Sequence, residues 1–289
     1  MNLENIYQSY ADKMTGLHLY QRAMQRLVES ECNQIAELEK FFKENSHLKS
    51  DAFSYDKMNY IDAETGESIF FGKNKSSLQD SKRHLLTHKN KQYQWLLVEA
   101  YEEFEDVLES LYAYAGYKDH NFWSLRDFGS ITLSQLSCQD YSWFLSQAVR
   151  KKDAPSSIIN AFRVRFPKIK EIEVNNSFGI NLFLAINLLE MLRHLIVHNG
   201  GVALDKEEFK NRVLKKSGLY NNGKPESQYV EFIEYYFGTG NDSNHINMLE
   251  KRLCSEYRLP VYINTFDELT GYLMAYVNEI TKRLNEAKA

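Results

Sequence analysis

Apolar residues recur at three- and four-residue steps over most of the chain, which is the periodicity of amphipathic helices. The clearest runs cover residues 3–45, 76–114 and 266–284. Between the first two, residues 53–73 carry aromatic residues in a different rhythm around a polar, glycine-containing turn, which suggests a β-hairpin or an aromatic loop. We therefore expect a mainly all-α protein with one small hairpin near 53–73.

Glycine and proline mark where the remaining elements begin and end. Pro155 suits a helix start, Pro167 a helix end, and Gly116 is expected to stop the second long helix, which has a candidate break near 89–91. Further elements are expected as helices at 156–166, 204–216 and 248–257, a helix-turn region at 125–149, and either a strand or a helix at 229–237.

The domain division expected from this pattern has two parts. Residues 1–75 form an N-terminal helical extension that contains the hairpin, and residues 76–289 form a helical domain. With only 4 prolines and 13 glycines, the chain has few helix breakers, which favours this helical interpretation.

The most apolar run, residues 178–199, carries an unusual set of polar residues. At ~100° per residue, Asn187, Glu190, His194 and His198 fall within a stripe of roughly 80°, and Arg193 lies about 60° beyond its edge. Charged and imidazole groups on a largely buried helix cost stability unless something faces them. The stripe is therefore a candidate site for a ligand or for a second copy of the chain.

The same helix is expected to end directly after this stripe. Gly200-Gly201 follows Asn199, and glycine readily takes the left-handed conformation that ends helices. His198 would then lie in the last turn, where the helix dipole favours its protonated form. Glu190, one turn before His194, can orient that imidazole ring.

Arginine and histidine together can support phosphodiester cleavage without a metal. A base activates the ribose 2′-hydroxyl, Arg193 stabilises the charged phosphorane, and an acid protonates the leaving 5′-oxygen. The chain has no phosphate-loop motif, no nucleophile elbow and no carboxylate–histidine spacing typical of metals, so no cofactor or metal is expected. The residues alone leave a structural alternative open, in which Arg193, His194 and His198 pair with an acidic block at 99–109 and hold a dimer together.

Charge is distributed in blocks along the chain. The net charge of −4 argues against a generic polyanion binder. Residues 73–91 and 150–170 are nevertheless basic, and they form either solvated helix faces or a nucleic-acid track. The candidate RNA-binding residues in these blocks are Arg83, His88, Lys151, Lys152, Arg163 and Arg165. Arg83 and His88 also repeat the spacing of Arg193 and His198, which we interpret as a chance surface feature that can contact phosphate.

Compartment signals are few. The 3 cysteines are isolated, which favours a reducing environment over a disulfide framework. The N-terminus has no signal-peptide pattern, and polar residues interrupt every long apolar run. We therefore expect a cytoplasmic protein that does not enter a membrane.

The motif Arg193-His194-x3-His198, followed by Asn199-Gly200-Gly201, resembles the hallmark of the HEPN superfamily: arginine, a polar residue, three variable residues and histidine near the end of a core helix. Residues 95–111, centred on Phe104-Glu105, look like the first core helix of such domains. Residues 156–167 and 266–284 look like the helix before the motif and the last helix. The resemblance covers about residues 76–285 and is strongest at 178–201, while residues 3–73 are not assigned by it.

This resemblance implies a HEPN-like helical bundle that forms a homodimer and sets two such motifs across a cleft. Many family members are metal-independent endoribonucleases in toxin–antitoxin, antiviral defence or abortive infection systems, some restrained by an antitoxin or regulatory partner. By that likeness Arg193 contacts the scissile phosphate and His198 acts as acid or base, with His194, Asn199 and Glu190 in support. His194 departs from the asparagine often found at its position. Other members bind nucleotides or partner proteins without catalysis, which is the alternative function.

Overall fold

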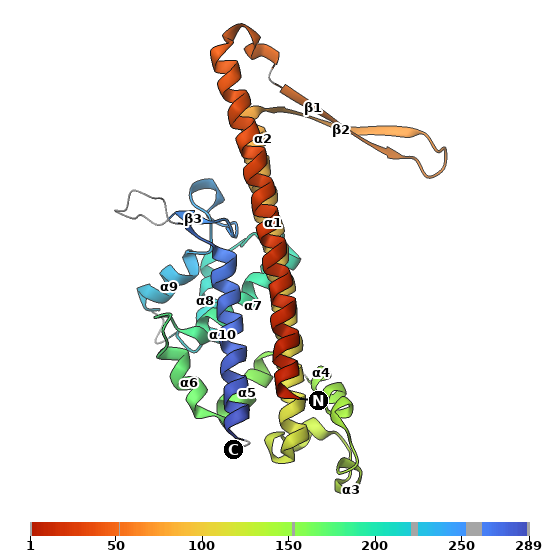
Figure 1. Cartoon of the computed structure of the whole chain (residues 1–289), viewed down its shortest axis with the longest axis vertical. Helices are drawn as coiled ribbons and strands as arrows, with labels where there is room; N and C mark the ends of the chain where they lie inside the picture. The colour runs from red at the N-terminus through yellow and green to blue at the C-terminus, as the bar shows by residue number, and fades with distance from the viewer. Residues whose placement is uncertain (1, 52, 152–153, 221–224, 253–261, 288–289) are drawn as a thin grey trace. The chain divides into compact units, whose positions relative to one another are not determined.

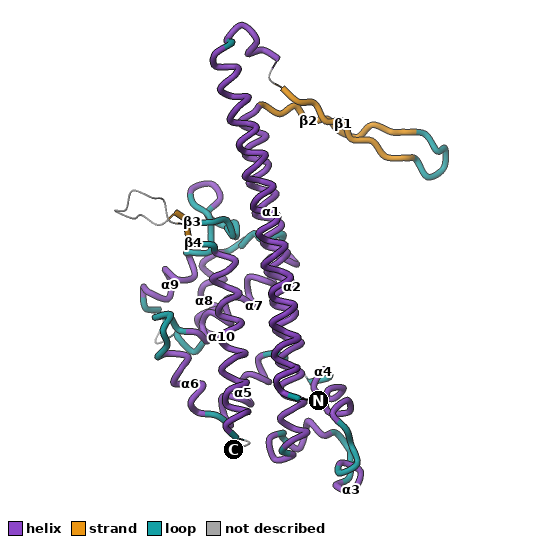
Figure 2. Tube along the Cα trace, in the orientation of Figure 1, coloured by secondary structure: helices purple, strands orange, loops and turns teal. Residues whose placement is uncertain are grey.

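The computed structural model describes residues 2–51, 53–151, 154–220, 225–252 and 262–287. Helices dominate this part of the chain, and strands are confined to one hairpin and one short pair (Figure 1, Figure 2). The expected mainly all-α fold is therefore confirmed. Among the described residues, none of the helices has the length and apolarity that crossing a membrane requires.

The chain divides into two compact units, which we call the core unit and the hairpin unit. The core unit comprises Met1–Leu19 and Tyr93–Ala289, and the hairpin unit comprises Tyr20–Gln92. This division differs from the expected boundary after residue 75. The physical reason is that α1 (Leu3–Glu44) and α2 (Leu78–Lys118) each continue without a break from one unit into the other. Leu3 and the other apolar residues in the first turns of α1 are buried in the core unit.

The hairpin unit contains the predicted β-hairpin. After the 3₁₀ turn η1 (Ser46–Asp51), β1 (Phe53–Ile61) pairs antiparallel with β2 (Ser68–Ser77). At the turn, the Asp62 carboxylate accepts hydrogen bonds from the backbone of Glu64 and Thr65, at 3.0 and 2.7 Å. The hairpin expected near 53–73 is thus confirmed.

Helix α2 differs from its prediction in two places. It has no break at 89–91, and it continues through Gly116 to Lys118. Gly116 serves close packing instead, because a Cβ atom there would lie 2.4 Å from the Trp123 indole ring. That indole stacks on Tyr112, with ring centroids 5.0 Å apart, and its Nε1 donates to the Tyr112 carbonyl at 2.9 Å. The glycine was therefore wrongly interpreted as a helix stop.

The core unit is built around α7 (Leu182–Asn199), which packs against α10 (Thr265–Glu286), α6 (Pro167–Val174) and α8 (Lys206–Lys216). The predicted final helix at 266–284 is confirmed in α10. The buried apolar side chains from α7, α10 and α2 include Leu188, Leu189, Leu192, Leu273, Val277, Phe104 and Leu108.

Shorter elements complete the core unit. They are η2 (His120–Phe122), η3 (Leu125–Phe128), α3 (Leu133–Leu136), α4 (Tyr141–Val149), α5 (Ser156–Arg165), α9 (Ser227–Glu234), η4 (Gly240–Asp242), β3 (Lys251–Arg252) and β4 (Tyr262–Ile263). The helix expected at 248–257 is wrong for its described part, where β3 pairs antiparallel with β4. Residues 253–257 of that prediction lie outside the described residues.

A buried polar network joins α5, α6 and α10. Glu173 is 3% exposed and accepts a hydrogen bond from the Tyr276 hydroxyl at 2.7 Å. The Arg163 Nε lies 3.0 Å from the same oxygen, Oε1, and donates a hydrogen bond to Oε2 at 3.1 Å. The Arg163 guanidinium also covers the Phe183 ring at 3.8 Å from its centroid. Since both charged groups are satisfied within the fold, this network positions the helices that surround α7.

Candidate functional site

Both ends of α7 are fixed by local interactions. The Asn181 side chain caps the first turn by accepting from the Leu184 backbone at 2.9 Å. This cap explains why the helix begins after residue 181 rather than at 178. At the other end Gly200 adopts φ 61°, and the Gly201 N–H donates to the Leu195 carbonyl at 2.9 Å. The predicted Gly200-Gly201 stop is confirmed.

The polar stripe on α7 separates into a buried start and an accessible end. Asn187 is 4% exposed, and its amide donates to the Phe183 carbonyl at 2.9 Å, so it serves the helix itself. Glu190 and Arg193 are half-buried, whereas His194 and His198 are exposed. The accessible groups are therefore the ones available to a ligand.

A cavity of about 570 Å³ opens beside this end of α7. Its walls come from α2, α7 and α8 and from the segment before α5. The chemistry-bearing residues in its lining are Glu105, Glu190, Arg193, His194, Arg212, Lys215 and Lys216. Arg193, His194 and Glu190 were predicted from the sequence, whereas His198 and Asn199 do not line the cavity.

Helix α8 supplies cations that the sequence prediction missed. Lys215 and Lys216 follow Arg212 by three and four residues, so all three share one face of α8. That spacing was the available signal, but a basic helix face is most often simply solvated. Only the packing of α8 on α7 turns this face toward Arg193.

The cavity holds more positive than negative side chains. Lys216 forms an ion pair with Glu190. The Arg193 Nη2 lies 3.4 Å from Glu102 Oε1, and the Arg193 Nε is buried with no hydrogen-bond partner among the described residues. An unsatisfied guanidinium N–H in a cation-rich cavity favours an anionic ligand with several acceptor oxygens, such as a phosphate.

The Arg193–Glu102 pair also bears on the structural alternative for the motif. Glu102 belongs to the acidic block that was expected to face Arg193, and the pair forms within one chain. Its carboxylate side chain is 56% exposed, so the interaction is screened by solvent and contributes little stability. The pair therefore positions the Arg193 guanidinium, which keeps N–H groups to donate to a ligand.

Two acidic groups in the cavity lining, Glu105 and Tyr101, have raised pKa values. Burial, together with the nearby charge of Glu190, raises the pKa of Glu105 to about 7, although Arg193 acts in the opposite direction. Burial also raises the pKa of the Tyr101 hydroxyl well above its ordinary value, and the charges of Glu190 and Glu105 add to this. Glu105 is thus a group that changes charge near neutral pH at the wall of the cavity.

The two imidazoles lie against each other at the rim. The His194 and His198 ring centroids are 4.5 Å apart, and their planes are inclined by 51°. Desolvation lowers the pKa of His194, and the charges of His198, Arg212 and Arg193 act in the same direction. His194 is therefore neutral near pH 7 and able to accept a proton.

The basic blocks proposed as an RNA track are only partly accessible. Lys151 forms an ion pair with Asp127, its side chain is 15% exposed, and its ammonium covers the Tyr112 ring. Arg163 belongs to the buried network with Glu173. Both cations are held within the fold, so they are poorly placed to contact RNA.

The other residues of that track remain at the surface. Arg165 is exposed and pairs with Asp119 at 2.9 Å. In the hairpin unit, Arg83 is 72% exposed and lies 2.7 Å from Asp80, and His88 is exposed. Lys152 lies outside the described residues. Among the described candidates of the core unit, Lys151, Arg163 and Arg165 do not line the cavity at Arg193.

Within the described part of the chain, no three histidine, cysteine or carboxylate side chains come close enough together to hold a metal ion.

No family model, curated protein or solved structure matches this chain. The likeness to the HEPN superfamily therefore rests on the motif and helix pattern alone.

Proposed function

We propose that this protein is a metal-independent endoribonuclease that acts as a homodimer. The observation that carries the proposal is the cavity in which Arg193 and His194 meet the cations of α8, with the His198 imidazole against His194 just outside the lining. Arginine, neutral imidazole and surplus positive charge are the groups that phosphodiester cleavage by the ribose 2′-hydroxyl requires. The motif's resemblance to HEPN ribonucleases supports the same conclusion.

The roles follow from the position of each group. Arg193 holds the scissile phosphate with its planar guanidinium and stabilises the phosphorane, while Arg212 and Lys215 hold the neighbouring RNA backbone. Of His194 and His198, one accepts the proton of the 2′-hydroxyl and the other donates a proton to the leaving 5′-oxygen. Glu190, which pairs with Lys216, and Asn199, the last residue of α7, support these groups.

A second copy of the chain completes the proposed site. His198 is exposed and lies outside the cavity that its own chain forms, so it is free to face the motif of a partner. The defence or toxin role, and restraint by an antitoxin or regulatory partner, belong to the proposal because the family resemblance implies them.

The proposal is tested by incubating total RNA with purified wild type and with His198→Ala. Wild type should produce fragments with 2′,3′-cyclic phosphate ends in the presence of a chelator, and His198→Ala should lose at least about a hundredfold in rate. His245→Ala is the matched control, because His245 is an exposed imidazole of the core unit outside α7 and the cavity. Intact RNA with wild type, or equal loss in the control, would sink the ribonuclease proposal.

Mixing variants tests the homodimer. If the proton-transfer imidazole of one copy serves Arg193 of the other, a mixture of Arg193→Ala and His198→Ala chains should recover about a quarter of the wild-type activity. Random pairing makes half of the dimers mixed, and each of these contains one intact site. An inactive mixture would rule out a shared site.

The second candidate is a module that binds RNA or a nucleotide without cleaving it. The observation that favours it is that the cavity's cations suffice to hold a phosphate, while His198 lies outside the lining. This function predicts RNA binding that survives His198→Ala and weakens in Arg212→Ala, with no cleavage by any variant.

A further inference from the structure

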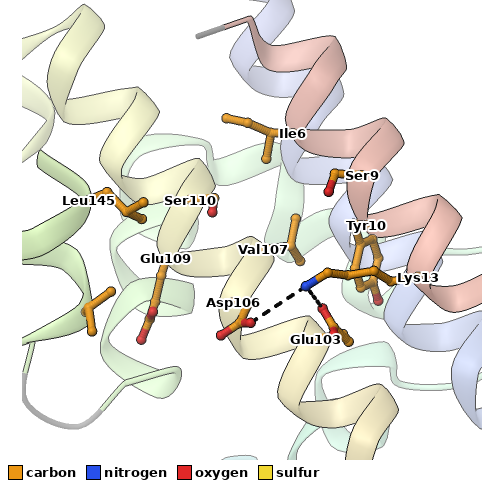
Figure 3. Close-up of a pocket in the computed structure, with 11 residues that line it drawn as sticks. Ile6, Ser9, Tyr10, Lys13, Glu103, Asp106, Val107, Glu109, Ser110 and Leu145 are labelled. Carbon is orange, nitrogen blue, oxygen red and sulfur yellow. Dashed lines mark hydrogen bonds and ion pairs between the residues drawn. The ribbon is translucent and has the colours of Figure 1, made fainter. Parts of the chain in front are cut away.

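A second cavity, of about 320 Å³, lies in the core unit between the first turns of α1, the middle of α2 and α4 (Figure 3). It shares no lining residue with the cavity at Arg193. Its charge is also of the opposite sign, because carboxylates outnumber cations in its lining.

The acidic wall comes from one face of α2. Glu103, Asp106 and Glu109 are spaced three residues apart, so they stand on the same side of the helix. Glu105, from the same acidic block, lies on another face and lines the cavity at Arg193. The acidic block is thus divided between two cavities of different character.

One ammonium group already occupies part of this wall. The Lys13 Nζ pairs with Glu103 and lies 3.9 Å from Asp106, as the dashed lines in Figure 3 mark. Glu109 is half-buried and makes no hydrogen bond or ion pair among the described residues. The contacts of Lys13 therefore show that these carboxylates can bind a primary ammonium. The Glu109 carboxylate remains without a cationic partner among the described residues.

The buried hydroxyl of Tyr10 is a second, independent observation that points to a ligand. Tyr10 is 2% exposed, it lines the cavity, and its hydroxyl has no hydrogen-bond partner among the described residues. In Figure 3 its ring lies beside Lys13, with the hydroxyl end toward Glu103. A buried hydroxyl without a partner costs free energy, which an N–H donor placed in the cavity would offset.

The rest of the lining is apolar and suits methylene groups. Ile6 and Val107 are each 4% exposed, and Leu145 and Val149 close the cavity from α4. The side chains of the lining include three carboxylates and one ammonium, which leaves about two negative charges to be matched. An occupant with two cationic ends and an alkyl middle fits both features.

We propose that this cavity binds a linear aliphatic diamine. One ammonium donates to the Glu109 carboxylate, and the other shares or replaces the position of Lys13 at Glu103 and Asp106, where it also donates to the Tyr10 hydroxyl oxygen. The methylene chain packs on Ile6 and the α4 side chains. The inference does not depend on the ribonuclease proposal.

The test is calorimetric titration of the full chain with 1,5-diaminopentane at low ionic strength. We expect saturable binding of one diamine per chain, and none of 1,5-pentanediol, which has the same length without charge. Glu109→Gln should weaken binding at least about fivefold, and Tyr10→Phe by a smaller factor. Lys13→Met should strengthen binding, because it removes the internal competitor.

Glu99→Gln is the matched control. Glu99 is an exposed acid on the same helix, outside the cavity, so its neutralisation should leave the affinity unchanged. Circular dichroism melts establish that each variant is folded. If Glu109→Gln is not folded, the loss of binding is measured with Tyr10→Phe instead. Absence of saturable binding, equal binding of the diol, or equal losses in Glu99→Gln and Glu109→Gln would overturn the proposal.

Discussion

Glu105→Gln should remove a pH dependence from RNA binding. The pKa of this carboxyl is raised from 4.5 to about 7, so it is neutral below that pH and ionised above it. Once ionised, it adds negative charge to the cavity and competes with phosphate for Arg193. Wild-type affinity should therefore fall as the pH rises through about 7, while the glutamine side chain stays neutral throughout.

The size of the effect follows from linkage. A bound phosphate is a like charge that we take to raise the pKa of Glu105 further, by about one unit. One unit is worth a tenfold change in affinity between the fully protonated and fully ionised forms. Between about pH 6 and pH 8 that range is only partly traversed, which leaves a loss of about fivefold. The variant should match wild type near pH 6 and bind about fivefold more tightly near pH 8.

Fluorescence anisotropy with a 2′-O-methyl RNA oligonucleotide measures this, because the modified RNA binds without being cleaved. Ionic strength is held constant across the series, since phosphate contacts depend on salt. The imidazoles of His194 and His198 are present in both proteins, so the difference between the two pH profiles reports on Glu105. Identical profiles for wild type and Glu105→Gln would refute the reasoning, whereas Glu99→Gln should reproduce the wild-type profile.

Three further predictions concern stability and are measured by urea unfolding. Gly116→Ala should lower the free energy of unfolding by about 1–3 kcal/mol, because its Cβ would lie 2.4 Å from the Trp123 ring. Gly271→Ala, whose Cβ would meet nothing within 4 Å, should raise that free energy by up to about 1 kcal/mol. A gain at both positions would disprove the packing argument. Asn181→Ala should cost about 1 kcal/mol through loss of the α7 cap, and an unchanged midpoint would show that the cap is dispensable. Glu173→Ala should cost about 2–4 kcal/mol, since it leaves the half-buried Arg163 cation and the Tyr276 hydroxyl without their partner, and a loss below about 1 kcal/mol would mean that the network relaxes freely.

Local signals were sufficient for much of the fold. The Gly200-Gly201 stop and the apolar stripe of α10 act over a few residues, so the sequence displays them directly. Gly116 has the same local appearance as a helix stop, yet its role depends on Trp123, which reaches it only in the folded chain. Signals of close packing between distant residues cannot be read from spacing alone.

The residues of the candidate site also divide into those that the sequence predicts and those that depend on packing. Arg193 and His194 were predictable because polar residues on an apolar helix stand out. Arg212 was missed because a basic residue on an amphipathic surface helix is unremarkable until the packing of α8 is known. Conversely, Arg163 looked available in a basic block but is neutralised by Glu173, on the adjoining helix α6.

The two fixed ends of α7 have a consequence for how this chain can change over evolutionary time. Asn181 and Gly200 hold the helix at a definite length, and each residue advances the helix by about 100° and 1.5 Å. A single residue inserted before Arg193 would turn the guanidinium away from the cavity and bring the apolar Leu192 into its place, and a single deletion would bring His194 there. This segment should therefore accept substitutions at its exposed positions but almost no change in length.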